Sequence, residues 1–87
     1  MDTASSPLVD RIARVLAGQH ASVNGDGDLE SASATVDETW KDFRNDALAV
    51  LHTIRAPTPH MAAAGDVATW ERMVLAALDE GKPGVVM

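Results

Sequence analysis

Apolar residues recur at helical spacing in three parts of the chain, and the first of these lies between residues 7 and 17. Ser6 suits an N-cap position and Pro7 the first turn of a helix, whereas Gly18 is a typical C-terminal stop. With about 100° between successive residues, one face of this helix carries Leu8, Ile12, Val15 and Leu16. The pattern therefore predicts an amphipathic helix that ends before Gly18.

The second pattern predicts the longest helix of the chain, which begins at Thr35 and ends near Arg55. Thr35 and Glu38 stand three residues apart, as in a capping box, where the two side chains bond backbone amides at the start of the helix. Pro57 disfavours helical backbone at the preceding residue and so ends the helix. A continuous apolar stripe runs along it, formed by Val36, Trp40, Phe43, Ala47, Val50, Leu51 and Ile54.

A corner with two prolines follows this helix. Thr58 precedes Pro59 in a second combination of cap and proline, so we expect a short helix over residues 60–64. Gly65 then releases the chain into the next element, and Met61 is expected to point inward. We interpret this segment as a corner that sets how two helices pack.

The third apolar pattern predicts a last helix that Asp66 caps and that Gly81 and Pro83 end. Leu75 falls off its main stripe, at a position where an isolated fold would leave this side chain exposed. The stripe itself consists of Val67, Trp70, Met73, Val74, Ala77 and Leu78.

Residues 19–34 are polar, small and acidic, and no periodicity survives among them. Asn24-Gly25 and Asp26-Gly27 are dipeptides typical of turns. We therefore expect a long mobile loop after the first helix. The whole pattern predicts an all-α fold, a small three- to four-helix bundle with this acidic loop.

The domain organisation follows from these elements. We expect a flexible lead over residues 1–6, a single helical domain over 7–81 and a flexible tail over 82–87. The apolar faces must pack together, but a chain of 87 residues builds only a thin core, for which burial and ordering nearly cancel. Self-association as a homodimer is therefore expected.

Charge and composition exclude several classes of function. The formal net charge of −6 argues against binding nucleic acid, which needs clustered basic residues. No apolar stretch approaches the roughly 20 residues that span a bilayer. The chain has no cysteine and its N-terminus lacks the pattern of a secretory signal, so we expect a cytoplasmic protein that contacts no membrane.

Three patterns that could carry chemistry have simpler interpretations. Glu38, Asp42 and Asp46 line one strip of the long helix, but no second set of ligands accompanies them, so a solvated face is expected. The segment from Asn24 to Glu30 resembles a calcium loop but fails the EF-hand spacing. No histidine has another histidine three or four residues away. We therefore predict no catalytic residue, no metal site and no cofactor.

Four residues could contact a partner instead of filling the core. Trp40, Phe43, Trp70 and Met73 have the helical spacing of core residues, and they also have the composition of an interface hot spot. In a helical dimer they would serve both roles, together with the off-stripe Leu75. We therefore expect a non-catalytic helical protein–protein interaction module.

The most specific pattern in the chain is Pro57-Thr58-x-x-Met61-x-x-Ala64-Gly65, followed by Trp70-x-x-Met73. It is accompanied by Ile12-Ala13, Leu16, Trp40, Ala49-Val50-Leu51, Arg55 and Ala76-Ala77. Through these positions, most of residues 8–78 resembles a loose group of short, uncharacterised helical proteins of alphaproteobacteria and their phages. The group has no assigned activity, so it implies no functional residue. This chain departs from it in a shorter link before the last helix and in the acidic Asn24–Gly27 insert.

The alternative function is an acidic regulator or inhibitor, of phage type or from a host, that binds a basic protein surface. Its working groups would be the five acidic residues that lie between Arg14 and Lys41 without an intervening basic residue, namely Asp26, Asp28, Glu30, Asp37 and Glu38.

Overall fold

The computed structural model describes residues 5–24 and 35–81, and every regular element in these ranges is a helix. The predicted all-α fold is therefore confirmed. None of the described helices has the length and apolar character that a membrane span needs. Residues 35–39 are helical, and the other elements are α1 (Leu8–Asn24), the 3-10 helix η1 (Trp40–Phe43), α3 (Arg44–Ile54), α4 (Pro59–Ala64) and α5 (Val67–Glu80).

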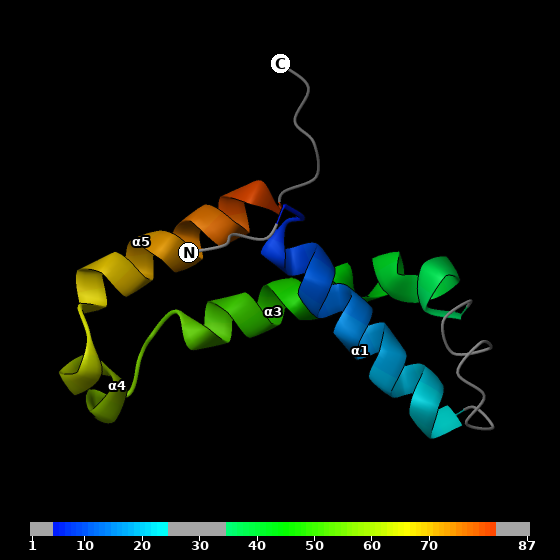
Figure 1. Cartoon of the computed structure of the whole chain (residues 1–87), viewed down its shortest axis with the longest axis horizontal. Coiled ribbons are helices and arrows are strands. Elements are labelled where there is room, and N and C mark those ends of the chain that lie inside the picture. The colour runs from blue at the N-terminus through cyan, green and yellow to red at the C-terminus, as the bar shows by residue number, and fades with distance from the viewer. Residues whose placement is uncertain (1–4, 25–34, 82–87) are drawn as a thin grey trace, which may run out of the picture.

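Helices α3 and α5 lie side by side and run in opposite directions (Figure 1). The short helix α4 connects them at one end of this pair. Helix α1 crosses α3 near the other end and packs on η1, on α3 and on the C-terminal part of α5 (Figure 1). The corner with α4 therefore lies at the far end of the α3–α5 pair from α1.

Helix α1 is longer than the sequence predicts. It runs through Gly18 to Asn24, so residues 19–24 of the predicted loop are helical and the predicted end is wrong. The continuation carries Ala21, which is buried, and Gly18 lies where a Cβ would stand 3.7 Å from Val36 Cγ2. Tertiary packing therefore outweighs the cost of placing a glycine inside a helix, which is about 1 kcal/mol relative to alanine. The rest of the predicted loop, residues 25–34, lies outside the described residues.

The buried face of α1 also differs from the predicted one. Its buried residues are spaced four apart, and Val15, which the pattern predicts on the inner face, is 61% exposed. The predicted Leu8, Ile12 and Leu16 are half-buried at the edge of this face. Small side chains let α1 approach η1 and α3 closely, because the distance between packed helices depends on the side chains at the contact. The buried residues are Val9, Ala13, Ala17 and Ala21.

The predicted long helix is interrupted by η1. The Thr39 hydroxyl donates a 2.7 Å hydrogen bond to the Thr35 carbonyl, a back-bond that often bends a helix. Side chains three residues apart align on a 3-10 helix, so Trp40 and Phe43 share one side. The Trp40 ring lies 5.6 Å from the Arg14 guanidinium, and Phe43 lies 5.5 Å from the His20 ring. Thus η1 turns both aromatic rings towards α1.

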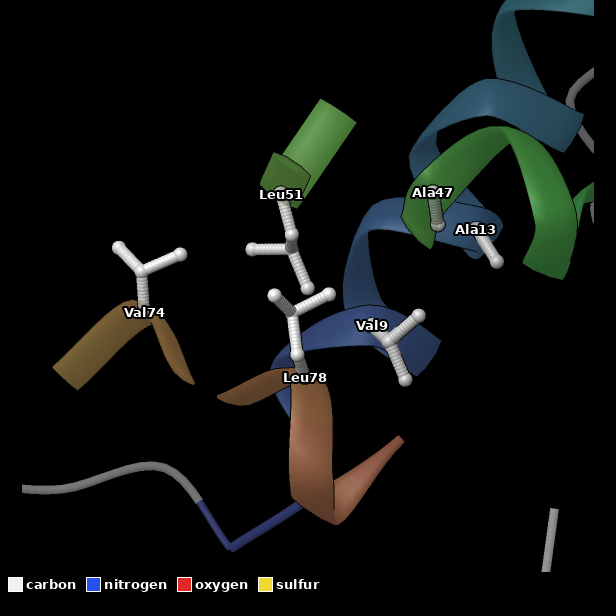
Figure 2. Packing of buried hydrophobic residues seen from close by; sticks show 6 residues of the cluster. All are labelled: Val9, Ala13, Ala47, Leu51, Val74 and Leu78. Atoms are coloured by element: carbon white, nitrogen blue, oxygen red, sulfur yellow. The ribbon is translucent and has the colours of Figure 1, made fainter. Parts of the chain in front are cut away.

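The core is small and rich in alanine (Figure 2). Leu51 of α3 and Leu78 of α5 point towards each other, and Ala13 and Ala47 lie where α1 crosses α3. Leu51 and Val9 are the largest side chains that are fully buried among the described residues. A core of this size leaves large apolar side chains elsewhere on the described surface.

The C-terminal end of α5 is held against α1 by a close approach. A Cβ on Gly81 would stand 2.4 Å from Val9 Cγ1, so no larger residue fits there without movement. The Arg44 guanidinium donates a 3.0 Å hydrogen bond to the Gly81 carbonyl. The same guanidinium lies 3.5 Å from a buried carboxylate oxygen of Asp10. Arg44 of α3 therefore links α1 and α5.

Candidate functional site

An open apolar pocket lies between α4 and the first half of α5. Its volume is about 410 Å³, which is within the usual range for ligand pockets. It lies in the part of the chain where the sequence predicts a structural corner. Its walls are Pro57, Met61, Ala62, Ala64, Gly65, Asp66, Val67, Thr69, Trp70 and Met73.

Two helix caps fix the walls of this pocket, and both were predicted from the sequence. The Thr58 hydroxyl accepts a hydrogen bond from the Met61 amide at 3.2 Å, which starts α4 with Pro59 in its first turn. The Asp66 carboxylate accepts a hydrogen bond from the Thr69 amide at 2.9 Å and starts α5. Local side-chain bonds therefore fix where both helices begin.

Trp70 anchors the pocket to the rest of the fold. Its side chain is half-buried and packs against the core, and its indole N–H donates a 2.8 Å hydrogen bond to the Ile54 carbonyl. Ile54 is the last residue of α3, where a backbone carbonyl has no partner within its own helix. The pocket wall is therefore bonded to the end of α3 rather than left to move with α4.

Large apolar side chains of this pocket are exposed. Met61 is 44% exposed, Val67 41% and Met73 64%. The predicted inward position of Met61 is wrong, because its side chain lines an open pocket on α4. Exposed clusters of large apolar residues in soluble proteins frequently mark contact surfaces.

The polar rim of the pocket is a short chain of hydrogen bonds. The Thr69 hydroxyl donates to the Asp66 carboxylate and accepts from the Arg72 guanidinium at 3.2 Å. The bonds from the Thr69 hydroxyl and the Thr69 amide lower the pKa of Asp66 below its ordinary value of 3.8. The Thr69 hydroxyl therefore links the Asp66 carboxylate on the rim to the Arg72 guanidinium next to the pocket.

The five predicted contact residues do not form one surface. Trp70 and Met73 line the pocket, whereas Trp40 and Phe43 pack beside α1, just before α3 begins. The length of α3, about 16 Å, separates this place from the end of α3 at which Trp70 is bonded. Both tryptophans still pack against the same core, as expected. Leu75 is 40% exposed but lies about 200° around the axis of α5 from Met73, away from the pocket.

The acidic candidates give no organised site in the part of the chain that the structure describes. Glu38, Asp42 and Asp46 are exposed, and η1 interrupts the helical strip that the spacing predicted. No three metal-ligating side chains of the described residues are grouped to hold an ion. The calcium-like segment lies outside the described residues, except for the backbone of Asn24. Of the acidic residues that would bind a basic partner, Asp37 forms an ion pair with Arg14.

The sequence did not reveal the pocket itself. The sequence predicts only structural roles for Val67 and Pro57 and none for Thr69, and nothing in their spacing shows that α4 and α5 leave space between them. The sequence indicated the site only through the caps at Thr58 and Asp66, which predict that two helices begin eight residues apart.

No protein-family model matches the chain, and no curated protein or solved structure shows significant similarity to it.

Proposed function

We propose that this protein is a non-catalytic helical interaction module whose contact surface is the pocket between α4 and α5. The proposal is carried by one observation, the 410 Å³ apolar pocket with Met61, Val67 and Met73 exposed on its walls. Burying such side chains contributes roughly 25 cal/mol per Å² of apolar area removed from water. A protein partner that inserts an apolar side chain therefore gains stability from this surface.

The character of the walls favours contact over chemistry. Apart from the rim groups of Asp66 and Thr69, the pocket is lined by alkyl, thioether, indole and glycine groups. The rim groups already bond each other, and the Thr69 hydroxyl also accepts from Arg72. An apolar centre with a polar rim is the usual anatomy of a protein–protein interface.

Rigid support of the pocket strengthens the proposal. Trp70 is bonded to Ile54, and both helices that form the walls begin at side-chain caps. A surface that is already held in place loses little conformational freedom when a partner binds, and this raises affinity. The large exposed residue Met73 then stands beside a fixed indole ring rather than on a mobile loop.

Photo-crosslinking in cells that express the protein tests this function. Met73 and, separately, Val15 are replaced by p-benzoylphenylalanine; the two positions are similarly exposed, at 64% and 61%. We expect the probe at Met73 to form a discrete protein adduct that the probe at Val15 does not form. Equal labelling from both positions, or no adduct from Met73, would contradict an interaction surface at the pocket.

A further inference from the structure

We infer that the occupant of the α4–α5 pocket is a second copy of this chain, in a two-fold symmetric contact. The inference rests on the proposed function and names its partner. In such a contact the same surface meets itself, so each group on one copy needs its complement on that same surface. The pocket face supplies both the apolar and the charged complements.

Opposite charges meet at Thr69, a residue of the pocket wall. The Thr69 hydroxyl bonds both the Asp66 carboxylate, which also lines the pocket, and the guanidinium of Arg72 beside it. A two-fold axis near Thr69 places Arg72 of each copy against Asp66 of the other, which gives two equivalent ion pairs. A surface for a basic or an acidic partner would carry one sign of charge instead.

The distribution of charge along the chain points to the same partner. The segment from Arg55 to Met73 carries two basic residues, Arg55 and Arg72, and two acidic residues, Asp66 and Glu71. Its formal charge is zero, so the whole net charge of −6 lies in the remainder of the chain. Two copies therefore meet through this segment without the repulsion that their other surfaces would cause.

The apolar part is also complementary to itself. Met73 is the most exposed large apolar side chain of the described residues, at 64%, and it stands on the wall of a pocket that has room for it. Met61 faces the same pocket and is 44% exposed. Methionine is flexible and fills irregular space, so the Met73 side chains of two copies can pack across the axis.

Sedimentation equilibrium of the full chain from micromolar to millimolar concentration tests the inference. We expect a reversible monomer–dimer equilibrium that Met73→Glu weakens by about tenfold or more, because a charge then enters the contact. Val15→Glu places the same charge on a similarly exposed site of α1 and leaves the equilibrium unchanged. A wild-type chain that remains monomeric throughout, or equal weakening by both variants, would overturn the inference.

A charge exchange tests the predicted pairing itself. Arg72→Glu sets like charges against each other twice in the symmetric dimer and weakens it by about tenfold. Arg11→Glu on α1 changes the net charge equally, from −6 to −8, and serves as the control. A mixture of Arg72→Glu chains with Asp66→Lys chains restores both ion pairs, so the heterodimer forms about tenfold more tightly than either variant forms a homodimer. No recovery in the mixture, with both variants helical by circular dichroism, would overturn the pairing.

These outcomes separate the inference from the proposed function. A wild-type chain that stays monomeric but crosslinks to a different protein from Met73 overturns the second copy and leaves the interaction surface in place. A chain that dimerises with equal sensitivity to Met73→Glu and Val15→Glu overturns this pocket as the dimer contact. The absence of any Met73 adduct in cells contradicts the function itself.

Discussion

The indole N–H of Trp70 donates a 2.8 Å hydrogen bond to the backbone carbonyl of Ile54, sixteen residues earlier in the chain. This bond joins the first half of α5 to the end of α3 and satisfies a carbonyl that has no partner within its own helix. It also fixes the wall of the pocket between α4 and α5. One side chain thus serves both the stability of the fold and the shape of the candidate contact surface.

Replacing Trp70 by phenylalanine tests this double role. The variant keeps an aromatic ring but leaves the Ile54 carbonyl without its donor, so we expect the free energy of unfolding to fall by about 1–3 kcal/mol. Trp40→Phe is the matched control, because the Trp40 ring packs with Arg14 and Lys41 through its face and not through an N–H bond. Urea denaturation followed by circular dichroism measures both. A Trp70→Phe loss no larger than that of Trp40→Phe would contradict the role of the bond.

Gly81→Ala tests the close approach of α5 to α1. The new Cβ would stand 2.4 Å from Val9 Cγ1, so the helices must move apart, at a cost of about 1–3 kcal/mol. Gly65→Ala is the control, since its Cβ would meet no atom within 4 Å and Gly65 has an extended backbone, with φ −159°. The double variant with Val9→Ala lacks Val9 Cγ1 but keeps Val9 Cβ, 2.9 Å from the added Cβ, so the effect of Gly81→Ala shrinks without disappearing. An unchanged Gly81→Ala effect in that double variant would show that Val9 is not the obstacle.

Leu51→Ala tests the position of the core. Leu51 is fully buried between α5 and α1, so we expect a loss of about 2–5 kcal/mol from transfer and cavity terms. Val50→Ala, one residue earlier and 37% exposed, should cost less than about 1 kcal/mol. Thermal or chemical unfolding distinguishes the two. Equal losses would mean that α3 does not present Leu51 to the core.

The Asp66 cap gives stability a specific pH dependence. Hydrogen bonds from Thr69 hold the pKa of Asp66 below 3.8, its ordinary value. A carboxyl whose pKa is lower in the folded than in the unfolded chain stabilises the fold fully above the unfolded pKa, and this contribution is lost as pH falls through the folded pKa. Asp66→Asn keeps a cap oxygen but does not titrate.

Urea denaturation of wild type and Asp66→Asn at several pH values measures this contribution. We expect the stability advantage of the wild-type chain to be constant from neutral pH down to about the unfolded pKa and to shrink below it. Comparison of the two chains cancels the titration of the other carboxyl groups. A difference that stays constant down to strongly acidic pH would contradict a charged cap at Asp66.

The elements that the sequence predicted well are those that local bonds determine. Thr58 and Asp66 each bond a backbone amide three residues later, so the starts of α4 and α5 follow from residues close in the chain. The end of α3 at Ile54 follows in the same way from the proline after Ala56. These features need no knowledge of distant contacts.

Other features depend on packing between distant segments, and the sequence pattern did not contain them. The buried face of α1 consists largely of alanine, which adds little to a hydrophobic pattern, so the larger Val15 was placed inside instead. Gly18 lies inside a helix whose continuation carries the buried Ala21. The pocket depends on how α4 and α5 lie relative to each other, and no spacing of residues predicted this arrangement.

The most direct test of the central claim follows the methionine methyl groups by NMR during dilution. Met61 and Met73 stand on opposite walls of the pocket, on α4 and α5, and both are exposed. A chain labelled with 13C-methyl methionine is diluted from millimolar to micromolar concentration, and the signals are assigned with Met61→Leu and Met73→Leu. We predict that the Met61 and Met73 signals shift together along one binding curve. Signals of both residues that do not change with concentration would contradict an α4–α5 contact between two copies.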